Sequence, residues 1–474
     1  MNPADNADFG LLSPASAGTA ASRLTSDYQF IQAMLDVELE WVRVLADAGY
    51  IDAGLLPTVE AASTAGQYDA ASLAERAQGG GNPVIPLLGD LRARVKESSP
   101  AAAAAIHKGA TSQDILDSAL LLMASRTLEV ILADLKTASA ALARLAETHR
   151  GTVTVARTLT QHSLPSTFGL KAANWLSGVG QAGVQLSEVA GRLPLQWGGA
   201  AGTMAALSSV AAKGPQNKTA NNDGGALALA AQLAERLGLA DPVAPWQTNR
   251  LPVTALAAAL ADVLAAAGKM ANDVLLLSRP EFGELSEPRA EGRGVSSAMP
   301  QKQNPVLSVL IRSAALAAPG HLAQVQAAAA GAIDERPDGS WHVEWQALRQ
   351  LLRLAGGAAA KLAELADGLV VHADRMQENL AITGPLVVSE KIMATVAPLL
   401  DDGAAGSGKP KVQALVNESL SGGTPFAQLL RGAVPQDKLS DADLQALLDP
   451  AGYLGQSDEL ITRIIEHYSD WSQA

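Results

Sequence analysis

The chain of 474 residues contains no cysteine, few aromatic residues and no excess of basic residues. Without cysteine, it cannot form disulfides, thiolate metal sites or a cysteine nucleophile. The formal net charge of −13, with no basic block to offset it, argues against nucleic acid or anionic membrane as a partner. Local cationic sites for a small anionic molecule remain compatible with this charge.

Targeting and membrane-spanning signals are also lacking. The first ten residues include Asn2, Asp5, Asn6 and Asp8 but no basic residue and no apolar run, so we expect no secretory signal. The longest apolar runs are rich in alanine and are interrupted by Asp, Lys or Gly, so we expect no transmembrane helix. These features predict a soluble cytoplasmic protein.

Long helical periodicity dominates the rest of the chain. Ile31, Leu35 and Val42 recur at helical spacing and predict a helix over residues 22–48, capped by Ser22 or Ser26. Further long helices are expected from about residue 112 to 150 and over 166–193, 251–278, 305–332 and 341–373. Aromatic content is 4%, and no stretch alternates convincingly over several strands.

These patterns predict an all-α protein with about five long helices at its centre. We place an N-terminal helical domain at residues 1–107, a central long-helix bundle at 108–375 and a C-terminal helical domain at 376–474. Alanine-rich helices of this length expose much apolar surface, which predicts oligomerisation.

The most unusual connection includes the loop at residues 292–305, within a polar stretch of about twenty residues. Its glycines allow backbone N–H groups to form an anion cradle. Lys302 adds a positive charge, Asn304 adds a carboxamide, and Ser296 or Ser297 could carry a proton. These features favour an active-site lid over an exposed Gly/Ser loop with chance polar content.

Further polar clusters lie at the ends of predicted helices, at residues 107–114, 158–162, 246–250 and 334–345. Each alone is a weak signal, because a lone histidine is more often structural and helix capping alone explains Thr111 and Ser112. The histidines lack the spacing of metal ligands, so we expect no metal site. Thr111 and Asp114 have the spacing of a capping box.

Taken in order, these clusters resemble the fumarase/aspartase superfamily. Residues 296–305, SSAMPQKQNP, resemble its signature loop, and residues 109–114, GATSQD, resemble its first motif, which follows His107. Residues 158–169 occupy the place of its second motif. The resemblance covers about residues 20–400. It implies an all-α homotetramer with a twenty-helix core, in which three subunits assemble each active site.

Within that superfamily the chain is most similar to the 3-carboxy-cis,cis-muconate cycloisomerases, through residues 81–87, 159–165, 341–345 and 384–390. This likeness implies lactonisation of a small polycarboxylate in protocatechuate degradation by the β-ketoadipate pathway, without metal or cofactor. Ser296 would transfer the proton, while Lys302 and Asn304 stabilise an aci-carboxylate. The implied substrate-binding residues are His107, Thr111, Ser112, Thr160, Gln161, His162, Gln247, Ser297, Met299 and Arg336.

Two positions depart from the superfamily. Relatives that eliminate fumarate place a histidine, which helps to protonate the leaving group, where this chain has Leu159; the nearest histidine here is His162. Lactonisation transfers only one proton, to carbon, so it tolerates the missing acid better than elimination does. Val295 stands where the superfamily has glycine, so we expect a different local turn.

Two alternatives remain open. One is a fumarate-releasing lyase of the adenylosuccinate or argininosuccinate type, and Gln301 is typical of the loop in the latter. The other is a catalytically silent helical protein, as lens crystallins of this superfamily are.

Overall fold

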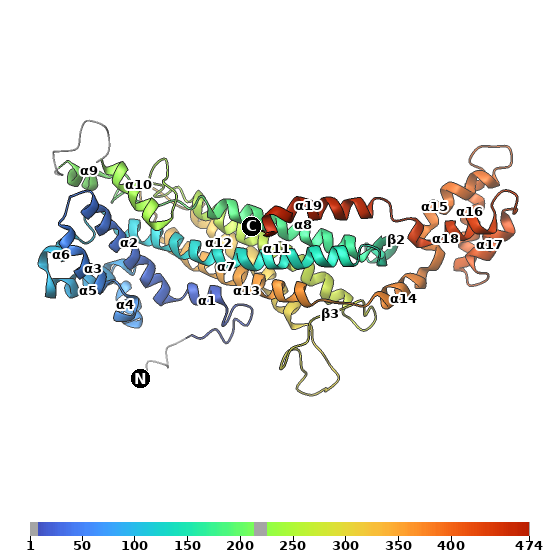
Figure 1. Cartoon of the computed structure of the whole chain (residues 1–474), viewed down its shortest axis with the longest axis horizontal. Helices are drawn as coiled ribbons and strands as arrows, with labels where there is room; N and C mark the ends of the chain where they lie inside the picture. Colours follow the sequence, from blue (N-terminus) through green and yellow to red (C-terminus); the bar gives the residue numbers. More distant parts are fainter. Residues whose placement is uncertain (1–7, 213–224, 474) are drawn as a thin grey trace. The chain divides into compact units, whose positions relative to one another are not determined.

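The computed structural model describes residues 8–212 and 225–473, and helices form nearly all of its regular structure (Figure 1). The predicted all-α fold is confirmed. Internal contacts divide the chain into two compact units. Unit 1 comprises Met1–Leu135, Gln181–Gly268 and Leu310–Leu362, and unit 2 comprises Lys136–Gly180, Lys269–Val309 and Ala363–Ala474. The three domains expected from the sequence have other boundaries and stay a prediction.

The five expected long helices are all present, and each contributes residues to both units. Within unit 1, small residues let helices approach closely: a Cβ placed on Gly268 of α11 would lie 2.6 Å from the Cβ of Ala315 on α12. Pro319 lies inside α12 without ending it. The long helices are α7 (Ser112–Thr148), α8 (Phe168–Ala190), α11 (Leu251–Leu277), α12 (Val306–Ala330) and α13 (Gly339–Gly368).

Unit 1 begins with short helices, and here one expected helix is two. The helix predicted over 22–48 is interrupted at Thr25, whose N–H and hydroxyl both bond the Ala21 carbonyl, and Ser26 caps the second helix. The shorter helices of unit 1 are α1 (Ala20–Leu24), α2 (Asp27–Asp47), α3 (Leu56–Ala62), α4 (Ala70–Ala77), α5 (Val84–Ser98), α6 (Pro100–Ala105), α9 (Ala205–Ala211) and α10 (Ala226–Leu237).

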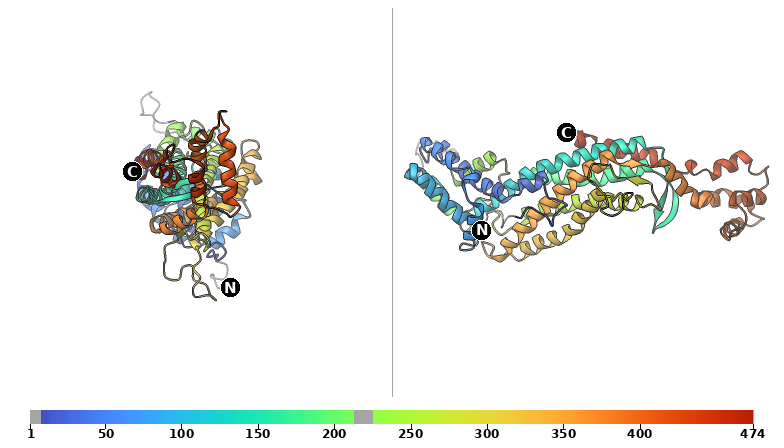
Figure 2. Two further views of the ribbon diagram at one scale, coloured as in Figure 1. Left: turned by 90° about the vertical axis from the view of Figure 1, so that its right-hand side faces the viewer. Right: turned by 90° about the horizontal axis from the view of Figure 1, so that it is seen from below.

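Unit 2 contains a β-hairpin that we did not predict. Strands β1 (Val153–Thr158) and β2 (Gln161–Thr167) pair antiparallel and appear as two arrows in the right-hand view of Figure 2. A second, minimal sheet pairs β3 (Leu285–Ser286) with β4 (Val370–Val371). These strands were not found in the sequence because each segment is too short to show sustained alternation.

The C-terminal part of unit 2 has its own apolar core, which includes Val155 of β1, Val388, Ile392 and Phe426. The helices after residue 372 are all shorter than the five long ones. They are α14 (Ala373–Thr383), α15 (Ser389–Val396), α16 (Gly408–Leu420), α17 (Phe426–Ala433), α18 (Asp441–Leu448) and α19 (Ser457–Gln473).

Three segments are long and apolar enough to cross a membrane, judged by length and composition alone. They are Leu251–Leu277, Val306–Ala330 and Ala373–Leu400. The expectation that no segment has this character was wrong, because abundant alanine and leucine outweigh the few interrupting polar residues. Asn2, Asp5 and Asn6, which entered the expectation about a signal peptide, lie outside the described residues.

Candidate active site

The residues expected at the site fall into both units, and each unit is described by itself. Those in unit 1 are His107, Thr111, Ser112, Gln247 and Arg336. Those in unit 2 are Thr160, Gln161, His162, Ser296, Ser297, Met299, Lys302 and Asn304.

In unit 1, Arg336 meets the first residues of α7. Its guanidinium donates to the Thr111 hydroxyl over 3.2 Å and to the Ser112 hydroxyl over 2.7 Å, and it lies 5.4 Å from the ring centre of Trp341. Within residues 8–212 and 225–473, no carboxylate forms an ion pair with Arg336. A partly buried guanidinium without a counter-ion, beside a helix N-terminus, is suited to a carboxylate ligand.

Asp114 forms one of the two hydrogen bonds of the expected capping box. Its carboxylate accepts the Thr111 N–H over 2.9 Å, but the Thr111 hydroxyl is engaged by Arg336. The same carboxylate accepts the N–H groups of Gly198 (2.7 Å) and Gly199 (3.0 Å). Burial raises the pKa of Asp114 to about 6, although these N–H donors favour the charged form. Asp114 thus ties the start of α7 to the connection after α8.

His107, just before α7, is held by Glu38 of α2. The Glu38 carboxylate accepts the backbone N–H of His107 over 3.0 Å and lies 2.6 Å from its Nδ1. His107 has a φ of +62°, in the left-handed region that few non-glycine residues adopt. The carboxylate therefore secures both the backbone and the ring.

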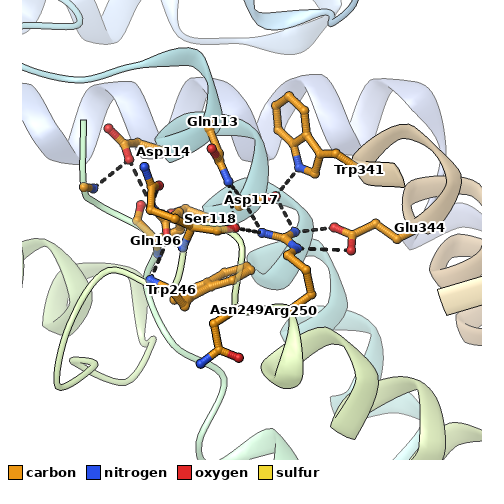
Figure 3. Close-up of polar contacts among 12 residues, drawn as sticks. Gln113, Asp114, Asp117, Ser118, Gln196, Trp246, Asn249, Arg250, Trp341 and Glu344 are labelled. Atoms are coloured by element: carbon orange, nitrogen blue, oxygen red, sulfur yellow. Dashed lines mark hydrogen bonds and ion pairs between the residues drawn. The ribbon is translucent and has the colours of Figure 1, made fainter. Parts of the chain in front are cut away.

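Beneath these groups lies a buried ion network centred on Arg250 (Figure 3). Its guanidinium bonds Asp117 over 2.8 and 3.0 Å and pairs with both oxygens of Glu344, and Trp341 donates to Asp117 over 2.8 Å. Burial raises the pKa of Glu344 to about 7, against the opposing charge of Arg250. Because Arg250 is 2% exposed, the network braces α7, α11 and α13 and does not face a ligand.

Gln247 is committed to protein partners. Its side-chain oxygen accepts from Gln196, its amide nitrogen donates to the Gly199 carbonyl over 3.1 Å, and the residue is 7% exposed. Its φ of +36° is held by the bond from its N–H to the Gln196 oxygen, 3.0 Å long. In this conformation Gln247 shapes the connection and has little capacity left to bind substrate.

In unit 2, the loop at 292–305 is closed at its base. The Gly294 carbonyl accepts both the backbone N–H (2.8 Å) and the side-chain amide (3.1 Å) of Asn304. A Cβ on Gly294 would lie 2.4 Å from the Asn304 carbonyl oxygen, so only glycine fits there. Val295 pairs with Gln303 in an antiparallel bridge. That extended conformation suits a β-branched residue, which explains how Val295 is tolerated.

Glu287 secures the other side of this loop. Its carboxylate accepts the N–H groups of Leu307 (3.0 Å) and Ser308 (2.7 Å) at the start of α12. The long connection is therefore a loop anchored at both ends, and such loops are frequently functional.

Ser296 lies within the loop with its hydroxyl oxygen facing backbone donors. It accepts the N–H groups of Met299 over 3.1 Å and Ala298 over 3.3 Å. Two such donors stabilise negative charge on the oxygen and so favour a reactive serine. Ser297, Met299 and Lys302 are exposed. Within the described chain, Lys302 forms no ion pair, so its charge is free to meet an anion.

The remaining expected residues lie at the tip of the β1–β2 hairpin. Leu159 and Thr160 form a two-residue turn with φ of +48° and +73°, and Leu159 is 96% exposed. Gln161 donates to the Thr160 hydroxyl over 3.2 Å. His162 Nδ1 lies 2.8 Å from the Thr383 hydroxyl, and burial, then the charge of Arg157, lowers its pKa. The lowered pKa favours the neutral form of His162.

Sequence reasoning missed several residues that position the site. Glu38 and Asp117 are acidic residues within the apolar faces of α2 and α7, which is the signal that would have found them. Gln196 lies in a connection and carried no such signal. No group of three potential metal ligands was found among the described residues.

Comparison with known proteins identifies relatives along nearly the whole chain. A family model described as lyase matches residues 82–320. Nitrosuccinate lyase of Streptomyces davaonensis is 43% identical over 97% of this chain and 94% of its own. 3-Carboxy-cis,cis-muconate cycloisomerase of Bradyrhizobium diazoefficiens is 37% identical over 96% and 97%. The solved 3-carboxy-cis,cis-muconate lactonizing enzyme of Pseudomonas putida is 33% identical, with a TM-score of 0.87 over 98% of this chain and 100% of that one.

Proposed function

The chain belongs to the lyase family of the fumarase/aspartase superfamily, and from that membership we propose that it lactonises 3-carboxy-cis,cis-muconate to 4-carboxymuconolactone. One substrate carboxylate adds to an internal alkene carbon and forms the ring C–O bond. The alkene electrons pass towards a neighbouring carboxylate, and one proton then reaches the carbon alpha to it. No atom leaves, and the net change is an isomerisation.

The observation that carries this proposal is the environment of Ser296. A serine hydroxyl that accepts two backbone N–H groups is suited to exchange a proton with carbon, because the same donors stabilise the oxygen after the proton has left. The unpaired charge of Lys302 supports the accumulation of negative charge on a substrate carboxylate. Asn304 holds the base of the loop through Gly294.

Arg336 supplies the expected carboxylate recognition. Thr111 and Ser112 orient its guanidinium, and the N-terminus of α7 adds partial positive charge. A substrate with three carboxylates needs several such contacts, and His107 is placed to provide another.

The hairpin tip favours a reaction that needs only one proton transfer. Leu159 is exposed where fumarate-releasing relatives carry an acid, and His162, whose pKa is lowered by burial, bonds Thr383. An amine leaving group must be protonated before it departs from carbon, so elimination of the adenylosuccinate or argininosuccinate type would be slow here.

The 43% identity to nitrosuccinate lyase supports a second candidate, elimination of nitrite from nitrosuccinate. Ser296 would then remove a proton alpha to one carboxylate, and the C–N bond would break to release nitrite as an anion, leaving fumarate. Nitrite needs no proton from the enzyme to depart. The absence of an acid at Leu159 is therefore compatible with this reaction as well.

We further propose a cytoplasmic homotetramer with composite active sites. On α12, Leu316 is 72% exposed and Val309 is 48% exposed, as expected of a helix that other subunits cover. Light scattering of the purified protein tests this proposal, and a stable monomer would exclude it.

The two reactions are separated by assaying one purified preparation with both substrates. Lactonisation destroys the conjugation of the muconate and lowers its ultraviolet absorbance. Elimination from nitrosuccinate instead raises absorbance through fumarate and yields nitrite, which a colorimetric assay quantifies. Turnover of the muconate at least tenfold faster supports the cycloisomerase, and the reverse ratio supports the lyase. Activity on neither substrate would reject both.

A further inference from the structure

The Glu38 carboxylate is buried and has one polar partner residue. It is 3% exposed on α2, and within the described chain only His107 bonds to it, through backbone N–H and Nδ1. A buried carboxylate is tolerated only when it is paired and hydrogen-bonded. Its two oxygens therefore constrain the backbone and the ring of the same residue.

This pairing determines which atom of His107 is available to a ligand. A carboxylate only accepts hydrogen bonds, so Nδ1 carries a hydrogen whether the ring is neutral or charged. The Nδ1–Oε1 distance of 2.6 Å is typical of a charge-assisted bond. Within residues 8–212 and 225–473, Nε2 has no hydrogen-bond partner. Nε2 is therefore the one ring atom of His107 that can meet a substrate.

Helix α2 supports the same turn at a second point. Trp41, one helical turn after Glu38, donates its indole N–H to the Lys108 carbonyl over 2.9 Å. The turn leads directly into Thr111 and Ser112, which orient Arg336. In this turn Trp41 bonds only a backbone carbonyl, and its ring packs against Trp197. Trp41→Phe therefore removes the bond to the turn without touching Glu38 or His107.

We propose that Glu38 is a positioning residue: it holds His107 with a hydrogen on Nδ1 and so directs Nε2 to bind a substrate carboxylate. As an imidazolium, His107 donates from Nε2 to that carboxylate while Glu38 balances its charge. This role rests on the proposed function, since it concerns the same polycarboxylate substrate.

The test compares Glu38→Gln with Trp41→Phe in the full-length protein. In Glu38→Gln the amide oxygen can accept the backbone N–H while the amide nitrogen donates to Nδ1. The ring hydrogen then moves to Nε2. We expect nitrogen-15 NMR of labelled histidine, assigned with His107→Asn, to show a hydrogen on Nδ1 in the wild type and a hydrogen on Nε2 alone in Glu38→Gln.

Steady-state kinetics provide the second measurement. Glu38→Gln should raise KM about tenfold, because a neutral Nε2–H group replaces the charged donor, and change kcat less than threefold. Glu38→Asp should keep the Nδ1–H form and recover part of the KM. Trp41→Phe should change neither value. A wild-type tautomer in Glu38→Gln, or an equal rise of KM in Trp41→Phe, would overturn the proposal.

The positioning role can be tested even if the proposed reaction is wrong or one variant does not fold. If neither substrate is turned over, titration with fumarate decides: a shift of His107 Nε2 in the wild type but not in Glu38→Gln supports the positioning role. No shift in the wild type overturns it. If Glu38→Gln does not fold, an Nε2–H tautomer in Glu38→Asp overturns it instead.

Discussion

The ion network around Arg250 and the loop around Ser296 use polar residues in opposite ways. Arg250, Asp117 and Glu344 are almost fully buried and bond one another, whereas Ser296 is partly exposed and bonds backbone N–H groups of its own loop. The network holds helices in place and has no free capacity for a ligand. The loop leaves Lys302 without an ion-pair partner among the residues that the structure describes. Polar residues thus support the fold where their hydrogen-bonding capacity is used up, and they stay available to a ligand where it is not.

Breaking the ion network around Arg250 should change the free energy of unfolding more than any other substitution proposed below. Arg250→Met leaves Asp117 and Glu344 buried without a counter-ion, so we expect a loss of about 3–5 kcal/mol in the free energy of unfolding, measured with urea. Arg236, which pairs with Glu40 and Asp47 at the surface, provides the control. Arg236→Met should cost about 1 kcal/mol or less. Equal losses would show that burial does not distinguish the two arginines.

The buried Asp114 should make the stability of the fold depend on pH, which an exposed carboxylate should not do. Its pKa is raised to about 6 from an ordinary value of 3.8, so the folded state binds more protons than the unfolded state between these values. The raised pKa of Asp114 contributes about 3 kcal/mol to the free energy of unfolding. This contribution is fully present below pH 3.8 and is lost as the pH rises through 6.

The measurement is the free energy of unfolding between pH 4 and 7. Asp114→Asn should remove this fall with rising pH, whereas the exposed Asp437→Asn should retain the wild-type profile. An unchanged profile in Asp114→Asn would contradict the assignment.

Substitution in the loop should affect turnover and spare stability. Ser296→Ala removes the proposed proton carrier, and we expect kcat to fall on the order of 10²-fold or more. Its melting temperature should stay near that of the wild type, because the hydroxyl bonds only its own loop. Ser297→Ala is the matched control and should lose less activity. Near-wild-type turnover in Ser296→Ala would exclude the assigned role.

Substitution at the hairpin tip should have the smallest effect, and it should stabilise the protein. Leu159 and Thr160 both have positive φ, which favours Asn-Gly in a turn of this kind. Replacing them by Asn and Gly should raise the free energy of unfolding by about 1 kcal/mol through relief of backbone strain. Thr158→Gly, at an extended position of the same hairpin, should instead lower it by about 0.5–1 kcal/mol. A decrease in both variants would refute the strain.

Helices were predictable because their signals are local. Periodic apolar residues placed the five long helices, and Ser26, one of the two expected caps, is the cap of α2. The hairpin was not predictable, since Leu159-Thr160 is not a typical turn sequence and β1 and β2 are short. The role of Gln247 was also beyond local reasoning, because its partners Gln196 and Gly199 lie about fifty residues away.

By itself, the sequence determined the helical class, the loop with Ser296, Lys302 and Asn304, and the first motif at residues 107–114. Helical periodicity and the polar character of the loop depend on residues that are close together in the sequence. Tertiary structure alone decided that Thr111 meets Arg336, that Glu38 holds His107, and that Gln247 is occupied within the protein. These pairings join distant segments, and burial selects them because each polar group removed from water must find a partner.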